Sequence, residues 1–200
     1  MEKLKEIAFI IVAAVASFVL INILLSAGAY AQNNYIYIDQ VGNNNQVSVT
    51  QDGTGHVAAV AIGATLPITA NDLKTGYGIG TTPYNGVGTS EYNNVTISQQ
   101  GVGSHTTTIE LPRASSNLIT VDQSGAGNHT FGISSTANTN NINNTISATQ
   151  SGSGDKAFAL TLDGTNGATV TVQQTNPTQA NTGAMTIQCT TCGSYSYIRN

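Results

Sequence analysis

The sequence has no tryptophan and very few charged residues. Only 8% of its 200 residues are charged, with 6 Lys and Arg against 10 Asp and Glu. Ordinary globular domains carry about 25% charged residues. Six cations cannot form a patch that follows a phosphate backbone, which argues against nucleic-acid binding. A net charge of −4 also imposes little Coulomb penalty on copies of the chain that stack on one another.

Cysteine is scarce, and its placement argues against metal and redox chemistry. Cys189 and Cys192 make half of a zinc site, and the sequence has no second pair. Gly193 follows Cys192, where a haem-attachment motif requires histidine. In an oxidising compartment the pair is expected to form a small disulfide loop or to remain as two idle thiols. We therefore expect no metal and no cofactor.

The acidic and hydroxyl residues do not form a catalytic set. Asp39, Asp122 and Asp163 lack a second carboxylate at a useful spacing, and no Ser, His and Asp combine into a mechanism. Residues 101–103 read Gly-Val-Gly, a fragment of a phosphate loop, but neither the lysine nor the helix of such a loop follows. The sequence predicts a protein that is not an enzyme and takes no small-molecule substrate.

A long apolar run lies near the N-terminus. Lys3 and Lys5 precede residues 7–25, which contain no charge, and Ala29-Tyr30-Ala31 follows. A charged start, an apolar run and a small-x-small exit are typical of a secretory signal peptide. The sequence therefore predicts a hydrophobic signal helix over residues 1–31. The run is also long enough to cross a bilayer, so a retained anchor is the alternative.

Small and amide-bearing polar residues are abundant, and they recur in register. The chain contains 21 Asn, 12 Gln, 28 Thr and 16 Ser. A segment that opens with Asn, alternates apolar residues and closes six residues later with Gln occurs five times, with a looser sixth copy. The copies are Asn34–Gln40, Asn45–Gln51, Asn93–Gln99, Asn117–Gln123, Asn144–Gln150 and the looser Ala168–Gln174.

A glycine stands two places after the closing Gln in each of the five full copies. These arc glycines are Gly42, Gly53, Gly101, Gly125 and Gly152. Period-2 alternation predicts a β-strand with one buried face, and the glycine-rich stretch predicts a tight turn. A second alternating strand follows each turn, so each unit reads as strand, arc, strand.

One such unit cannot bury its apolar face alone, whereas stacked units can. We therefore predict an all-β fold, a β-solenoid of about five coils over residues 32–188. Residues 63–92 break the period and are predicted to form an irregular insert, and residues 189–200 a C-terminal tail. The apolar residues predicted to stack inside are Ile36, Ile38, Val95, Ile97, Ile119, Val121 and Ile146.

Amides at fixed corners of stacked coils can satisfy one another. A side-chain amide has both a donor and an acceptor, so a column of amides about 4.8 Å apart hydrogen-bonds along the stack. The predicted ladder comprises Asn34, Gln40, Asn45, Gln51, Asn93, Gln99, Asn117, Gln123, Asn128, Asn144, Gln150 and Gln174.

Residues 34–51 resemble a known repeat. They read Asn-x5-Gln-x-Gly-x2-Asn-x-Val-x3-Gln, which is similar to the Ser-x5-Gln-x-Gly-x2-Asn-x-Ala-x3-Gln repeat of curlin, the subunit of bacterial curli fibres. Asn34 replaces the opening Ser and Val47 the Ala. The resemblance implies a secreted subunit of an extracellular functional amyloid. It also implies export through an outer-membrane pore with chaperones, and polymerisation with itself and with a nucleator.

Two alternative functions and one alternative site remain open at this stage. A pilin-like filament subunit would keep residues 7–25 as an assembly helix, and a solenoid face rich in Thr would bind ice or glycans. His56, His105 and His129 follow three of the arcs and could form a metal-binding or pH-sensing column. We expect instead that they are polar turn residues facing water, because Lys156 takes the equivalent place in the next repeat.

Overall fold

The computed structural model describes residues 33–40, 43–62, 90–111, 113–135 and 140–200. The predicted signal segment, residues 1–31, and most of the predicted insert, residues 63–89, lie outside these ranges. No helix within the described ranges is long and apolar enough to span a membrane. The described part is all-β, as predicted.

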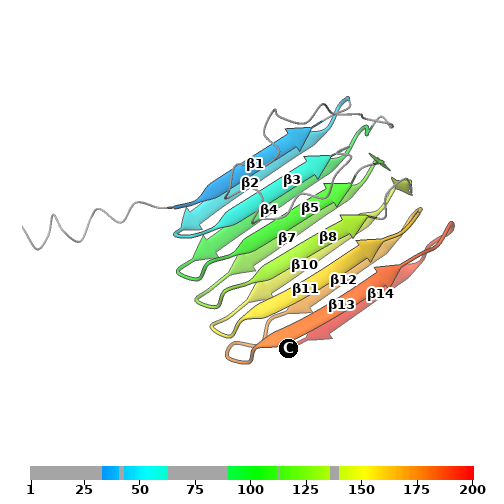
Figure 1. The fold of residues 1–200 in the computed structure, drawn as a ribbon. Helices are drawn as coiled ribbons and strands as arrows, with labels where there is room; N and C mark the ends of the chain where they lie inside the picture. The colour runs from blue at the N-terminus through cyan, green and yellow to red at the C-terminus, as the bar shows by residue number, and fades with distance from the viewer. Residues whose placement is uncertain (1–32, 41–42, 63–89, 112, 136–139) are drawn as a thin grey trace, which may run out of the picture. The chain divides into compact units, whose positions relative to one another are not determined.

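Twelve strands form two facing parallel sheets (Figure 1). Sheet A runs, in spatial order, β1 (Tyr35–Gln40), β3 (Val57–Ile62), β5 (Thr106–Leu111), β8 (Thr130–Ser135), β11 (Lys156–Leu162) and β13 (Asn181–Ile187). Sheet B runs β2 (Gln46–Gly53), β4 (Asn94–Gly101), β7 (Leu118–Ser124), β10 (Thr145–Ser151), β12 (Thr169–Gln174) and β14 (Ser194–Arg199).

The chain alternates between the sheets, which makes the fold a β-solenoid. Each sheet B strand leads through a short arc into the next sheet A strand, giving the coils β2–β3, β4–β5, β7–β8, β10–β11 and β12–β13. These five coils confirm the predicted number. A short third pairing, β6 (Ala114–Ser115) with β9 (Asn141–Ile142), lines the return corner between coils.

The core is a stack of aliphatic side chains between the sheets. Val95, Ile97, Ile119, Val121 and Ile146 are buried, as predicted. The alternation of the strands produces this arrangement, because residues of one parity face inward and those of the other face solvent. Burying one such side chain stabilises the fold by about 1.5–3 kcal/mol.

Ile36 and Ile38 are exceptions to the predicted core. Their exposed fractions are 52% and 43%, although their register partners Ala58 and Val60 in β3 are fully buried. The pairing places the two isoleucines on the inner face of sheet A. They remain exposed because β1 is the outermost described strand of sheet A, so that β2 covers their inner face from one side only.

The return corners use left-handed backbone at one repeated place. Asn44, Tyr92, Ser116 and Asn143 have φ between 55° and 59°, and Gly167 has φ 77°. Each stands immediately before the first residue of a repeated segment. Ser90–Tyr92, at the end of the predicted insert, belong to such a corner, because Glu91 forms a parallel bridge with Ser115. The insert therefore ends earlier than the sequence predicted.

Candidate functional site

The glutamines that close the sheet B strands form one continuous column. The Nε2 of Gln51 donates to the Oε1 of Gln99 at 2.8 Å, and the same bond recurs from coil to coil at 2.7–2.9 Å. The column comprises Gln51, Gln99, Gln123, Gln150 and Gln174, and the last four are fully buried. A column of this kind is satisfied at every step only while each layer carries an amide.

The same glutamines also tie the two sheets together. The Nε2 atoms of Gln99, Gln123 and Gln150 donate to the backbone carbonyls of Val57, Thr106 and Thr130 at 3.0–3.1 Å. Each of these carbonyls belongs to a sheet A strand. Loss of one Nε2 would therefore break both the bond to the next glutamine and this link between the two sheets.

A second column of amides stands at the opposite end of the sheet B strands. Asn93 donates to Asn45, Asn117 to Asn93 and Asn144 to Asn117, through Nδ2 and Oδ1 at 2.8–2.9 Å. Each Nδ2 of Asn93 and Asn117 also donates to a carbonyl of the return corner at 2.8 Å. Ala168 ends the column, and its backbone N–H donates to the Oδ1 of Asn144.

Asn34 and Gln40 do not belong to these columns, which corrects the predicted ladder. Their strand, β1, pairs with β3 in sheet A, and Gln40 stands beside Ile62. Asn34 instead accepts a hydrogen bond from the backbone N–H of His56 at 3.0 Å. The spacing of the asparagines along the sequence already distinguished Asn34 from the column. Asn34 and Asn45 are half a coil apart, whereas Asn93, Asn117 and Asn144 are separated by a full coil of 24 to 27 residues.

Asn128 is also placed elsewhere than predicted. It is exposed in the arc between β7 and β8. Its Oδ1 accepts from the backbone N–H of Ser104 at 2.9 Å, and its own backbone N–H donates to Asp155 Oδ1 at 2.8 Å. These three residues form a polar column on the outer surface of successive arcs. The column shares the solenoid period, which is why sequence spacing did not separate it from the buried ladder.

The arc glycines occupy backbone that other residues adopt with strain. Gly53, Gly101, Gly125 and Gly152 have φ between 110° and 129°. A Cβ on Gly125 would lie 2.5 Å from the carbonyl oxygen of Gly152 in the next arc. Glycine is thus required both for the turn and for the close stacking of arcs. Gly42 lies outside the described residues.

The three histidines are buried, so the expectation that they face water is wrong. His56, His105 and His129 are fully buried and stack face to face, with ring centroids 4.8 Å apart. Each Nε2 contacts a carbonyl of its own arc, those of Asp52, Gln100 and Ser124, at 2.9–3.1 Å. The rings lie at the start of sheet A strands, on the inward-facing parity. That parity was the sequence signal for burial.

Burial favours the neutral imidazole form of His105 and His129. The pKa of His105 falls from 6.5 to about 4, mainly through loss of solvation, with smaller contributions in the same direction from His129 and His56. Burial also lowers the pKa of His129, with a smaller contribution in the same direction from Lys156. The Nδ1 atoms of His105 and His129 have no hydrogen-bond partner among the described residues. A second N–H on either ring would therefore be left unsatisfied.

Lys156 continues the histidine column as a buried ammonium group. The residue is fully buried, and its Nζ donates to the carbonyls of Gly154 and Gln179. Burial lowers the pKa of Lys156, and Asp155 opposes this shift. The column runs Asn34, His56, His105, His129, Lys156, Asn181 by strand register. It therefore begins and ends with an amide.

The C-terminal segment is part of the solenoid rather than a tail. Cys189 and Cys192 form a disulfide, and β14 then pairs with β12 over six residues. Tyr195 and Tyr197 pack against the core at this end. Their alternation is the period-2 signal of a strand, but β14 lacks the Asn and Gln that marked the other repeats. The prediction of a tail from residue 189 is thus wrong.

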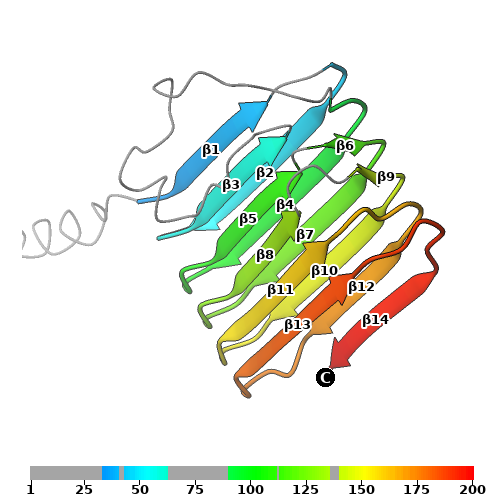
Figure 2. The same ribbon diagram turned by 45° about the vertical axis from the view of Figure 1, so that its right-hand side comes forward.

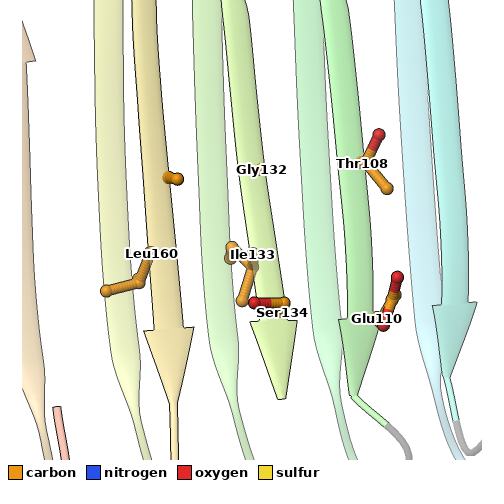
Figure 3. Close-up of a pocket in the computed structure, with 7 residues that line it drawn as sticks. Thr108, Glu110, Gly132, Ile133, Ser134 and Leu160 are labelled. Atoms are coloured by element: carbon orange, nitrogen blue, oxygen red, sulfur yellow. The ribbon is translucent and has the colours of Figure 1, made fainter. Parts of the chain in front are cut away.

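The outer face of sheet A carries a shallow depression of about 280 Å³ (Figure 3). It lies over Gly132 and Ala159, whose small side chains leave the space, and Thr108, Glu110 and Ser134 stand around it. Glu110 is the one carboxylate in this lining. Within the described ranges, no group of three or more His, Cys, Asp or Glu residues is arranged to hold a metal ion.

Comparison with known proteins identifies one segment. Residues 30–53 match the family described as the curlin associated repeat. In the structure this segment contains β1 and β2. No curated protein and no solved structure matches the chain.

Proposed function

We propose, from the premise that this chain carries a curlin-type repeat, that it is a self-assembling subunit of a curli-like amyloid fibre outside the cell. The observation that carries the proposal is the pair of continuous amide columns. The glutamine column runs from β2 to β12 and the asparagine column from β2 to β10.

A solenoid of this kind has the geometry of a fibre segment. All strand pairings in both sheets are parallel, and equivalent corners repeat coil after coil. Among the described strands, none pairs with the outer edges of β1, β2, β13 and β14, and an open edge of this kind templates the addition of further strands. With a net charge of −4 over 200 residues, stacked copies repel one another weakly.

The proposed setting is the cell surface and its matrix. The signal-like residues 1–31, the disulfide and the near absence of charge support export to an oxidising, extracellular environment. In that setting the fibre serves adhesion and biofilm structure. The subunit would then reach the surface through an outer-membrane pore with chaperones, and a nucleator subunit would start its polymerisation.

The test uses the purified chain without residues 1–31, together with the secreted protein. Both should form filaments visible by electron microscopy that bind thioflavin. Aligned filaments should diffract at about 4.8 Å along the fibre axis, because the strands lie across it. A protein that stays monomeric at high concentration would contradict the proposal. An extracellular protein that starts near Ile7 instead of Gln32 would favour the pilin-like alternative.

A further inference from the structure

All three histidines of the sequence occupy the same place in three successive coils. His56, His105 and His129 stand immediately before β3, β5 and β8, which lie side by side in sheet A (Figures 1 and 2). Their rings are fully buried and nearly parallel, with interplanar angles of 3° and 8° and centroids 4.8 Å apart. The arcs therefore hold every imidazole of the chain in one closed stack.

The contacts of the rings determine which nitrogen carries the proton. Each Nε2 lies 2.9–3.1 Å from a backbone carbonyl oxygen of its own arc. A carbonyl oxygen can only accept, so Nε2 is the protonated nitrogen and Nδ1 of the neutral ring carries the lone pair. At His56 this lone pair accepts a hydrogen bond from the backbone N–H of His105 at 3.3 Å. These hydrogen bonds suit a neutral imidazole.

A second proton finds no acceptor in any of the three layers. On His56 it would point at the N–H donor of His105. On His105 and His129 it would stand on a buried Nδ1 that has no hydrogen-bond partner among the described residues. A buried donor without an acceptor is unfavourable, and so is a buried charge without a partner. The geometry of the column accepts imidazole and opposes imidazolium.

The charged groups beside the column give a proton little compensation. Lys156 occupies the next layer and acts against a positive charge on His129, whereas Asp155 acts in its favour. The Asp155 side chain is exposed, as is that of Asp52, which contacts His56 through its backbone carbonyl. The glutamines that close the adjacent sheet B strands carry no charge. Protonated rings would therefore stack cation upon cation, with one buried ammonium group already in the row.

Folding thus changes the proton affinity of these side chains. The pKa of His105 falls from 6.5 to about 4, mainly through burial, and burial lowers the pKa of His129 as well. In the unfolded chain an imidazole keeps an ordinary pKa near 6.5. The unfolded chain therefore binds protons at a higher pH than the folded column does, and acid between these two values favours open coils.

We propose that the histidine column is a pH-sensitive switch for the coils β2–β3, β4–β5 and β7–β8. At neutral pH the stacked, neutral rings allow these coils to close. In mild acid the protonated rings open them, and the opened strands no longer present a solenoid to which further chains can add. The switch acts on the folding of the single chain, so it does not require that the chain forms fibres.

Replacing the three histidines by asparagine tests the switch. Strand register places asparagines at both ends of this column, Asn34 and Asn181. The Oδ1 of Asn34 accepts the backbone N–H of His56, as the His56 ring accepts that of His105, so asparagine keeps the acceptor and cannot titrate. Circular dichroism of the secreted protein should show loss of β-structure with a midpoint between pH 6.5 and about 4. The variant His56→Asn/His105→Asn/His129→Asn should have a midpoint at least about one pH unit lower.

A matched control returns three histidines to the outside of the solenoid. Ser48, Thr96 and Thr120 are exposed and stand in register on β2, β4 and β7. Adding Ser48→His/Thr96→His/Thr120→His to the histidine-free variant restores three imidazoles at the same layer spacing, but in water. Exposed charges are screened, so the acid midpoint should stay within about half a pH unit of the histidine-free variant. Recovery of the parent midpoint would mean that burial is not the cause and would overturn the switch.

Hydrogen exchange shows where the chain opens. The backbone N–H groups of Val57 and Thr106 donate to the carbonyls of two of the histidines, whereas that of Asn181 donates in a layer without histidine. Between neutral pH and about pH 5, exchange corrected for its intrinsic rate should accelerate at least about tenfold more at Val57 and Thr106 than at Asn181. Equal acceleration at these amides would contradict a switch that resides in the histidine layers.

The outcomes separate the switch from the proposed fibre function. A lower acid midpoint in the histidine-free variant, with faster exchange in the histidine layers of the parent, supports the switch. Equal midpoints of the parent and this variant would overturn it, even if both form fibres at neutral pH. If the triple variant does not fold at neutral pH, the single variant His105→Asn decides, and an unchanged midpoint there would also overturn the switch. A parent that shows the acid transition but forms no fibres would overturn the fibre function alone.

Discussion

Replacing three consecutive glutamines of the buried column by glutamate tests the ladder directly. Gln99, Gln123 and Gln150 are fully buried and joined through Nε2 and Oε1 at 2.8–2.9 Å. Glutamate keeps the shape of the side chain but removes every Nε2 donor. The triple variant therefore loses the rungs and the bonds to the carbonyls of Val57, Thr106 and Thr130.

The magnitude follows from the spacing of the layers. Two carboxylates about 4.8 Å apart repel by roughly 3 kcal/mol at an effective dielectric constant near 20. Each hydrogen bond lost with an Nε2 donor contributes about 0.5–1.5 kcal/mol more. Together these losses are comparable to the whole stability of a typical domain, which is about 5–15 kcal/mol. The triple variant should remain soluble and thioflavin-negative at neutral pH.

Mild acid should restore part of the assembly. Burial and neighbouring like charges both raise the pKa of a carboxyl group, so these glutamic acids should become neutral well above the usual pH and regain a donor. Because the parent also responds to acid through its histidines, assembly of the variant should be expressed as a ratio to the parent at each pH. That ratio should rise as the pH falls.

The matched control carries the same three charges outside the column. Gln46, Gln173 and Gln188 are exposed, so their triple glutamate variant should assemble nearly as the parent does at neutral pH. Thioflavin fluorescence and the protein left in the supernatant measure both variants. Equal assembly of the two triple variants at neutral pH would refute the reasoning, because it would mean that the glutamine rungs do not hold the coils together.

Three further predictions concern the histidines, an arc glycine and the disulfide. The folded pKa of His105 lies below its unfolded value of 6.5, so the unfolded chain binds more protons between pH 6.5 and about 4. The free energy of unfolding, which is highest above pH 6.5, should therefore fall with acid by at most about 3 kcal/mol. His105→Gln should flatten this fall in urea unfolding, and an unchanged slope would contradict the burial argument. Gly125→Ala should lower the free energy of unfolding by at least about 1–3 kcal/mol. The control Gly132→Ala, with no atom within 4 Å of the added Cβ, should change it little. Similar effects of the two substitutions would show that the arc backbone is not strained. Cys189→Ser/Cys192→Ser should lower the free energy of unfolding by at most about 2 kcal/mol, because the closed loop is short. Since β14 stays paired with β12, fibres should still form. A variant that is secreted but forms no fibres would contradict this prediction.

The repeat period and the polarity of its corners were readable from the sequence. Alternation in segments such as residues 117–123 predicted the strands, and Gly125 and its equivalents predicted the arcs, because both depend on local backbone chemistry. The full-coil spacing of Asn93, Asn117 and Asn144 likewise predicted a stack. Local sequence patterns of this kind predict a fold well when every repeat has the same pattern.

The assignment of strands to sheets was decided only by the tertiary structure. The Asn34–Gln40 segment has the same internal pattern as Asn45–Gln51, yet the two strands lie in opposite sheets, because consecutive strands of a coil alternate between sheets. Likewise, β14 carries no repeat signature and joins the solenoid because β12 offers it an open edge.

Burial of the histidine column was a tertiary outcome as well. The sequence showed the parity that these histidines share with the inward residues of their strands, and the opposing sheet then enclosed His56, His105 and His129 between the layers. The exposure of Ile36 and Ile38 has the opposite origin, since their own sequence favours burial and only the lack of a further described layer beyond β1 leaves them open. Alternation along the chain determined which side chains share a face, whereas the presence of a neighbouring strand decided which of those faces are covered.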